Sequence, residues 1–210
     1  MAAKNLKGIF ITFEGAEGSG KSTQAKRIVA YLKGIKKKVL HIREPGGVKI
    51  SERIRDILLS LKSRRMSGEC EVLLYMAARA QLVEEVICPA LKRGDIVLCD
   101  RFLDSTIAYQ GYGNGANQRM IQTIGRWATA NITPDLTLLF DIDAREGLRR
   151  AGSAKDRIEK RPLRYHQRVR RGYLALARRE PGRIKVIKVD GDKDAIHAKV
   201  RCYIDKLLGL

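Results

Sequence analysis

Residues 15–22, Gly-Ala-Glu-Gly-Ser-Gly-Lys-Ser, match the phosphate-binding loop pattern G-x-x-x-x-G-K-[ST] and constrain the fold more than any other segment. In this pattern the glycines let successive backbone N–H groups point at a polyphosphate, Lys21 neutralises the outer phosphates, and the Ser22 hydroxyl can reach Mg²⁺. Residues 9–14 before the loop predict a buried strand, and residues 22–32 after it have helical apolar spacing. Strand, loop and helix in this order favour a nucleoside triphosphate site over a flexible Gly-Ser loop. The predicted site comprises Gly15, Ala16, Glu17, Gly18, Ser19, Gly20, Lys21, Ser22 and Thr23.

Apolar runs alternate with helical patterns along the rest of the chain. The runs predict strands near residues 9–14, 39–43, 96–99, 136–141 and 184–189, and the periodic stretches predict helices near 22–33, 50–61, 70–92, 103–110, 118–130, 144–150, 163–179 and 193–208. This alternation is typical of an α/β fold, a parallel sheet with helices on both faces. No repeat or linker is evident, so we expect residues 1–210 to form one domain. The small residues at 151–155, between two basic helices, predict a mobile flap.

The formal net charge of +19 is concentrated in one part of the chain, because residues 145–185 contain 15 Lys and Arg against 4 Asp and Glu, a net +11. Such a block could bind nucleic acid, guide ATP and nucleoside monophosphates toward a site, or form a solvated surface. The sequence has no nucleic-acid-binding module and few aromatic residues among the basic ones. We therefore prefer the solvated surface and expect no nucleic-acid partner.

Local composition argues against other classes of protein. No run approaches the ~18 consecutive apolar residues of a membrane span, so no membrane partner is expected. Residues 1–8 contain no apolar signal core, so we expect the protein to stay in the cytoplasm. The four cysteines form no C-x-x-C pair, which argues against a zinc site.

Two polar residues follow the predicted strand at 96–99. Asp100 comes directly after the apolar run, at the Walker B position, where a carboxylate holds Mg²⁺ directly or through water. The alternative is an ordinary strand-end salt bridge, which the phosphate loop and the adjacent Arg101 make the weaker interpretation. Arg101 would point into the crevice where ligands of α/β proteins bind, and its guanidinium fits phosphate oxygens.

A second cation follows the strand at 39–43. The turn Arg43-Glu44-Pro45-Gly46-Gly47 directs Arg43 into the same crevice, although read alone it could be a capping turn. Twelve residues later Arg55 lies on a predicted helix that is otherwise apolar on one face. Arg43, Arg55 and Arg101 could therefore enclose one anionic group, and a phosphate monoester is the natural ligand.

Two pairs at i, i+4 spacing offer groups that could read a nucleobase. Tyr75 and Arg79 share one face of the helix at 70–92, and Thr106 and Gln110 share one face of the next helix, with Tyr109 beside them. A core tyrosine with a snorkelling arginine explains the first pair equally well, and helix capping or surface decoration explains the second. These residues alone do not decide between the interpretations.

Together these segments resemble the bacterial-type thymidylate kinases, P-loop enzymes that transfer the γ-phosphate of ATP to dTMP. The motifs that carry the resemblance are Phe13-Glu14-Gly15 leading into the loop, Arg43-Glu44-Pro45-Gly46-Gly47, Asp100-Arg101-Phe102 continuing to Ser105-Thr106-x-x-Tyr109-Gln110-Gly111, and Asp156-Arg157-Ile158-Glu159. The resemblance extends from about residue 8 to about residue 180. It implies a three-layer α/β/α P-loop NTPase fold with a five-stranded parallel sheet, a short mobile lid at about 149–161, Mg²⁺ with ATP, and a homodimer.

The resemblance also assigns roles to residues. It implies that the substrate dTMP is bound by Arg43, Glu44, Pro45, Arg55, Tyr75, Arg79, Arg101, Ser105, Thr106, Tyr109 and Gln110. Among these, Tyr75 would stack on thymine, where the family more often has Phe, and Tyr109 would pack under the deoxyribose and leave no room for a 2′-hydroxyl. The implied product is dTDP, for dTTP biosynthesis. The alternative is a kinase of another pyrimidine nucleoside monophosphate, dUMP or UMP.

Catalysis by this family implies positioning and charge neutralisation rather than covalent chemistry. The implied catalytic residues are Lys21, Arg101, Asp100 and Glu14, with Ser22 and Asp100 as the metal ligands. Some members carry an arginine in the phosphate loop, where this chain has Ala16 and Glu17, so we expect the cation to come from Arg150 or Arg149 in the lid. Asn114 stands where many relatives have arginine, so the contact of that arginine is not expected here.

Overall fold

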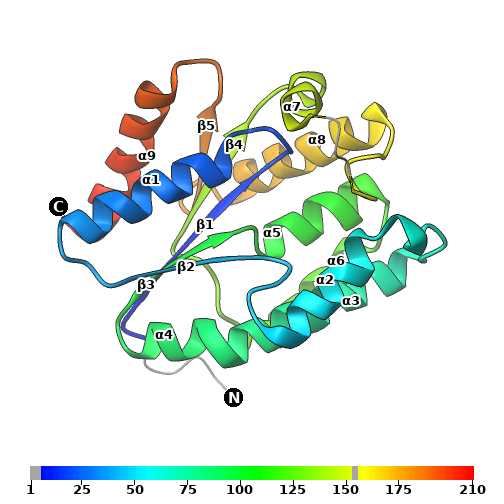
Figure 1. Cartoon of the computed structure of the whole chain (residues 1–210), viewed down its shortest axis with the longest axis horizontal. Helices are drawn as coiled ribbons and strands as arrows, with labels where there is room; N and C mark the ends of the chain where they lie inside the picture. Colours follow the sequence, from blue (N-terminus) through cyan, green and yellow to red (C-terminus); the bar gives the residue numbers. More distant parts are fainter. Residues whose placement is uncertain (1–5, 153–155) are drawn as a thin grey trace.

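The computed structural model describes residues 6–152 and 156–210, and within these residues five strands form one parallel sheet (Figure 1). The strands are β1 (Ile9–Gly15), β2 (Val39–Arg43), β3 (Ile96–Asp100), β4 (Leu136–Asp141) and β5 (Ile184–Lys188), in the spatial order β2-β3-β1-β4-β5. The predicted α/β fold class with five parallel strands is confirmed.

Helices cover both faces of the sheet. Successive side chains of β1 point to opposite faces, and both sets are apolar and buried under helices. Ile11 and Phe13 pack with α1 (Lys21–Gly34) and α9 (Lys193–Leu208) on one face. Phe10 faces the opposite side, where α4 and α5 contact β3 and β1. The helices of that larger layer are α2 (Lys49–Leu59), α3 (Gly68–Leu82), α4 (Cys88–Lys92), α5 (Leu103–Thr106), α6 (Gln118–Ala128) and α8 (Leu163–Arg179).

The strand order determines where a ligand can bind. β1 lies between β3 and β4, so the loops that follow β1 and its neighbours meet at the carboxyl edge of the sheet. The register pairs Phe13 with Asp100 and Asp100 with Arg43. The phosphate loop, Asp100 and Arg43 are therefore brought to the same edge by the sheet itself.

Two predicted helices are interrupted in the structure. The helix expected at 70–92 is α3, followed by a π-helical segment η2 (Val83–Ile87) and α4, and the helix expected at 103–110 is α5 followed by a π-helical segment η3 (Ile107–Gly113). A π-helix shifts backbone hydrogen bonds to i+5 and has no side-chain signature, so apolar periodicity could not show it. A short 3₁₀ turn, η1 (Leu61–Ser63), links α2 to α3. None of the helices in the described ranges is long and apolar enough to cross a membrane.

The structure describes the predicted lid at 149–161 only in part. Its first residues end α7 (Ala144–Ala151), and residues 153–155 lie outside the described residues. Its last part is a turn that Asp156 holds, since the carboxylate accepts hydrogen bonds from the backbone N–H groups of Ile158 (2.8 Å) and Glu159 (2.9 Å). Arg157 ties this turn to α2 through Nε to the Leu58 carbonyl, 2.8 Å.

Candidate active site

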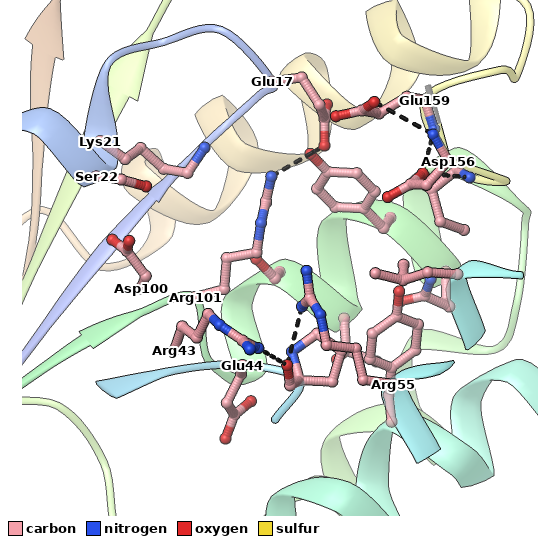
Figure 2. Close-up of a pocket in the computed structure, with 18 of the residues that line it drawn as sticks. Glu17, Lys21, Ser22, Arg43, Glu44, Arg55, Asp100, Arg101, Asp156 and Glu159 are labelled. Carbon is pink, nitrogen blue, oxygen red and sulfur yellow. Dashed lines mark hydrogen bonds and ion pairs between the residues drawn. The ribbon is translucent and has the colours of Figure 1, made fainter. Parts of the chain in front are cut away.

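A cavity of about 390 Å³ opens at the carboxyl edge of the sheet. All eleven residues predicted to bind substrate line it, together with the predicted metal ligands Ser22 and Asp100. The phosphate loop contributes Glu17, Gly18 and Lys21 to the wall. Figure 2 shows Lys21, Ser22 and Asp100 on one side, Arg43, Glu44 and Arg55 below, and Asp156 and Glu159 on the far side.

Other predicted residues lie outside the lining. Gly15, Ala16, Ser19, Gly20 and Thr23 of the loop do not face the cavity, and neither do Glu14, Arg149 and Arg150. Five residues that sequence reasoning gave no site role do line it: Leu59, Ala151, Asp156, Ile158 and Glu159. Asp156, Ile158 and Glu159 belong to the last family motif and Ala151 lies in the predicted lid, which were the available signals, whereas Leu59 at the end of α2 had none.

The phosphate loop owes its shape to its glycines. Gly18 has φ 66°, and Gly20, with φ 80°, directly precedes α1, both in the left-handed region that favours glycine. Lys21 starts the helix and folds back, so that its Nζ donates to the Ala16 carbonyl at 2.9 Å. Burial and the neighbouring Arg101 lower the pKa of Lys21 to about 8, against the opposing attraction of Glu17. A polyphosphate in the loop would favour the charged ammonium.

Arg101 is held in a strained backbone conformation at the end of β3. Its φ of 71° is uncommon for a residue with a side chain and is typical of functional sites. The guanidinium pairs with Glu17 Oε1 at 2.9 Å (Figure 2). It also lies 4.9 Å from the centre of the Tyr109 ring. Sequence reasoning missed the pairing with Glu17, since the two residues are far apart in the chain.

Glu17 remains a carboxylate although it is buried. Burial alone would raise its pKa, but Arg101, His166 and Lys21 together hold the pKa well below its ordinary value. The Tyr109 hydroxyl donates to Glu17 Oε1 at 2.6 Å. Glu17 is therefore an anion inside the phosphate loop that fixes both Arg101 and Tyr109.

Glu14 supports Arg101 from beneath the cavity. It is fully buried, and its carboxylate accepts hydrogen bonds from the Phe102 backbone N–H (2.7 Å), the Ser105 hydroxyl (2.6 Å) and the Tyr173 hydroxyl (2.9 Å). Burial and the nearby Asp104 raise its pKa to about 7. Its position favours holding the segment after β3 over direct contact with substrate.

Three arginines surround one part of the cavity. Arg43 and Arg55 both donate to the Pro45 carbonyl, at 3.0 and 2.9 Å, and Arg101 approaches from the end of β3. Arg43 is also paired with Glu52, at 3.0 Å. Burial and the neighbouring Arg43 lower the pKa of Arg55, which marks a cation cluster that an anion would relieve.

Another part of the cavity wall carries groups suited to a nucleobase. Arg79 is 2% exposed, pairs with Glu44 at 2.6 Å and donates to the Thr106 hydroxyl at 3.1 Å. Gln110 directs its amide NH₂ to Glu71 at 2.7 Å. Because a carboxylate only accepts, this contact fixes the amide orientation and leaves Gln110 Oε1 as an acceptor. Glu71 was not found from the sequence, since it resembles any acidic residue in the first turn of a helix.

The residues predicted to hold Mg²⁺ fit a hard cation. Asp100 Oδ1 is buried and has no hydrogen-bond partner among the described residues. Ser22 lines the same cavity, so a hydroxyl and a carboxylate oxygen are available together, the donor type that Mg²⁺ prefers. No cluster of three or more His, Cys, Asp or Glu side chains suited to a metal occurs in residues 6–152 and 156–210.

The arginines of the predicted lid do not reach the cavity. Arg149 and Arg150 both pair with Glu146, each at 2.7 Å, on the exposed side of α7. The helix itself packs tightly on the phosphate loop, because a side chain at Gly18 would clash with the Gly147 carbonyl oxygen and come within 3.0 Å of Arg150 Cβ. Arg150 is therefore beside the loop, whereas Arg149 is 73% exposed.

Known proteins are similar to this chain in sequence. The thymidylate kinase family model matches residues 13–200. The chain belongs to the thymidylate kinase family. It is 47% identical over 207 residues to the thymidylate kinase of Pelotomaculum thermopropionicum. The aligned region covers 97% of this chain and 95% of that relative. It is 46% identical over 209 residues to that of Solidesulfovibrio magneticus, covering 95% of this chain and all of the relative.

A solved structure extends the similarity to the fold. The crystal structure of thymidylate kinase from Ehrlichia chaffeensis superposes with a TM-score of 0.78 at 34% identity, over 94% of this chain and 98% of the other. The family resemblance inferred from the four motifs is thus confirmed.

Proposed function

We propose that this chain transfers the γ-phosphate of ATP to dTMP and releases ADP and dTDP. The observation that supports this proposal is that one cavity is lined by the phosphate loop, by Arg43, Arg55 and Arg101, and by the polar and aromatic side chains Tyr75, Arg79, Thr106 and Gln110. Its relatives carry the name thymidylate kinase, and none of them supports the alternative of a dUMP or UMP kinase.

In this reaction an oxygen of the dTMP phosphate attacks the γ-phosphorus, and the bond to the β–γ bridging oxygen breaks. Arg43, Arg55 and Arg101 would hold the acceptor phosphate, and the loop N–H groups with Lys21 would hold the donor. Mg²⁺ held by Ser22 and Asp100 would supply charge neutralisation between the phosphates. The protein's contribution is positioning and electrostatic stabilisation, because phosphoryl transfer requires little covalent chemistry.

Selection of thymine would depend on the far end of the cavity. Gln110 Oε1 would accept the N3–H of thymine, since its NH₂ is committed to Glu71. Arg79 would donate to the adjacent carbonyl from α3, and Tyr75, one turn earlier on the same helix, would stack on the ring. Tyr109, held by Glu17, would pack under the sugar and exclude a 2′-hydroxyl.

The transition-state cation is proposed to be Arg150, with Arg149 as the second candidate. The phosphate loop has no arginine, and α7 places Arg150 beside Gly18. Arg150 would then exchange its partner Glu146 for the migrating phosphoryl group. Such a contact would form in the transition state more than in the ground state.

A homodimer is proposed on the outer face of α2, α3 and α6. Three large apolar side chains are exposed on these helices, Ile57 (49%), Leu73 (55%) and Trp127 (83%), and α3 packs against both α2 and α6. A second copy of the chain would cover this face through a two-fold contact. Sedimentation should give a dimer for the natural chain and a monomer for Ile57→Asp/Leu73→Asp, and a monomeric natural chain would contradict the proposal. The single-domain organisation and cytoplasmic location stay predictions.

Direct product analysis tests the proposed reaction. ATP, Mg²⁺ and dTMP are incubated with the protein, and ADP and dTDP are separated and quantified. Equal amounts of the two products are expected, with no dTDP when Mg²⁺ is removed. Lys21→Met should abolish transfer without changing thermal unfolding, and a well-folded Lys21→Met variant with normal turnover would overturn the phosphate-loop assignment.

A further inference from the structure

A second cavity, of about 660 Å³, lies where η1, the end of η3 and the start of α8 come together. Six cations line it and its lining includes no carboxylate: Arg64, Arg157, Lys160, Arg161, Arg164 and Arg168. It shares no lining residue with the candidate active site. The turn at 156–161 separates the two, with Asp156, Ile158 and Glu159 facing the active site and Arg157, Lys160 and Arg161 facing the second cavity.

Three of these six cations have a partner within the protein. Arg157 and Arg161 pair with Glu71 at 2.6 and 2.9 Å, and Arg168 donates to the Gly113 carbonyl at 3.0 Å. Glu71 is 1% exposed and lies behind the wall of the cavity. One buried carboxylate thus faces six positive charges, which leaves a strong positive potential in a concave site.

The other three cations have no such partner. Arg64, Lys160 and Arg164 are exposed, and none forms an ion pair within residues 6–152 and 156–210. Arg64 directly follows η1, and Lys160 and Arg164 flank Pro162, so two segments that are far apart in the sequence direct positive charge to one cavity. An anion with several negative charges could contact them together.

Neutral hydrogen-bond donors are present as well. Tyr165 lines the cavity, is 2% exposed, and its hydroxyl has no hydrogen-bond partner in the described part of the chain. A buried hydroxyl without a partner is costly, so a ligand or water that accepts from it would be stabilised. The 17-residue helix α8 begins here, and no side chain caps its first turn. The Tyr165 N–H in this turn donates to the Pro162 carbonyl at 2.8 Å, and the dipole of the helix favours an anion at its N-terminus.

We propose that this cavity is a binding site for a polyphosphate group, inorganic or borne by a small molecule. A concave site with six cations in its lining fits a compact anion with three or more charges better than an extended strand. Nucleic acid would require an open basic stripe with stacking aromatics, and the only aromatic residue of this lining is the buried Tyr165. The proposal is independent of the proposed reaction.

Calorimetric titration with inorganic triphosphate at physiological salt tests the site. The protein is first saturated with a non-hydrolysable ATP analogue and dTMP, so that the phosphate loop is filled. One further triphosphate per chain is expected to bind. Arg64→Gln/Lys160→Gln/Arg164→Gln should weaken this binding at least about ten-fold, even if each cation contributes only as much as a surface ion pair.

Charge-matched controls make the outcome decisive. Arg178→Gln/Arg179→Gln/Lys199→Gln removes three exposed cations outside this cavity and should leave the affinity unchanged. Tyr165→Phe should weaken binding several-fold while the fold is retained. Absence of the additional triphosphate, equal loss in the control variant, or tighter binding of single-stranded DNA than of triphosphate at the same salt would each overturn the proposal. The variants alter no active-site residue. If the ATP analogue failed to fill the phosphate loop, triphosphate bound there would therefore appear as a second site that the variants do not weaken, which distinguishes it from the proposed site.

Discussion

The buried carboxyl group of Glu14 should make the stability of this protein depend on pH. Its pKa is raised to about 7 by burial and by Asp104, from 4.5 in an exposed glutamate. The folded state therefore holds the proton more tightly than the unfolded state. The associated stability is fully present below pH 4.5 and is lost as the pH rises through 7.

The magnitude follows from the size of the shift. A change from 4.5 to about 7 corresponds to about 3 kcal/mol, of which about 2–3 kcal/mol falls between pH 5 and pH 8. Glu14→Gln keeps an acceptor for the Phe102 N–H, places an NH₂ donor where the carboxyl group accepts from the Ser105 and Tyr173 hydroxyls, and cannot ionise. Relative to the natural chain, the variant should gain about 2–3 kcal/mol of unfolding free energy between these two pH values.

Urea unfolding of both proteins at pH 5, 6, 7 and 8 measures this difference. Glu52→Gln is the control, because the Gly47 N–H and Arg43 lower the pKa of Glu52 and its charge stays constant across this range. The Glu52→Gln difference should be nearly flat. A Glu14→Gln difference that is also flat, or that falls as the pH rises, would refute the reasoning.

Three further predictions concern the cavity and the neighbouring helix α7. Gln110→Ala should lower kcat/KM for dTMP by an amount equivalent to the ~1–3 kcal/mol of one unpaired buried group, and it should change the KM for ATP much less. Equal loss for both substrates would indicate a purely structural role. Arg149→Ala/Arg150→Ala should lower kcat at least about 100-fold while the KM values barely change, so unchanged turnover in steady-state assays would exclude the α7 cation. Arg79→Met should cost ~3–5 kcal/mol of unfolding free energy by leaving Glu44 buried and unpaired, and adding Glu44→Gln should recover part of it in urea titrations.

Local signals made much of the fold predictable. The strand at 9–14, the loop and the helix after it carry turn chemistry and apolar period in adjacent residues, and β1 and α1 appear where these signals indicated. The substrate residues were predicted because the family motifs keep them within short windows after strand ends. Parallel strands then bring those ends to one edge.

Long-range pairings could not be predicted in this way. Glu17 and Arg101 lie on different loops, and only the order of β1 and β3 brings them together. Glu71 organises Gln110 and Arg157 from inside a helix where periodicity shows only an acidic residue. The π-helical segment at Ile107–Gly113, which places Tyr109 and Gln110, likewise depends on packing against α8.

The most direct test of the central claim is kcat/KM measured by coupled ADP release over dTMP, dUMP, UMP and dCMP. The cavity predicts dTMP as the best acceptor. UMP and dCMP should be far poorer, because Tyr109 excludes a 2′-hydroxyl and Gln110 Oε1 meets an unprotonated N3 in cytosine. dUMP, which lacks only the methyl group, should lose ~10–200-fold at most. A value for UMP or dCMP equal to that for dTMP would contradict the assignment.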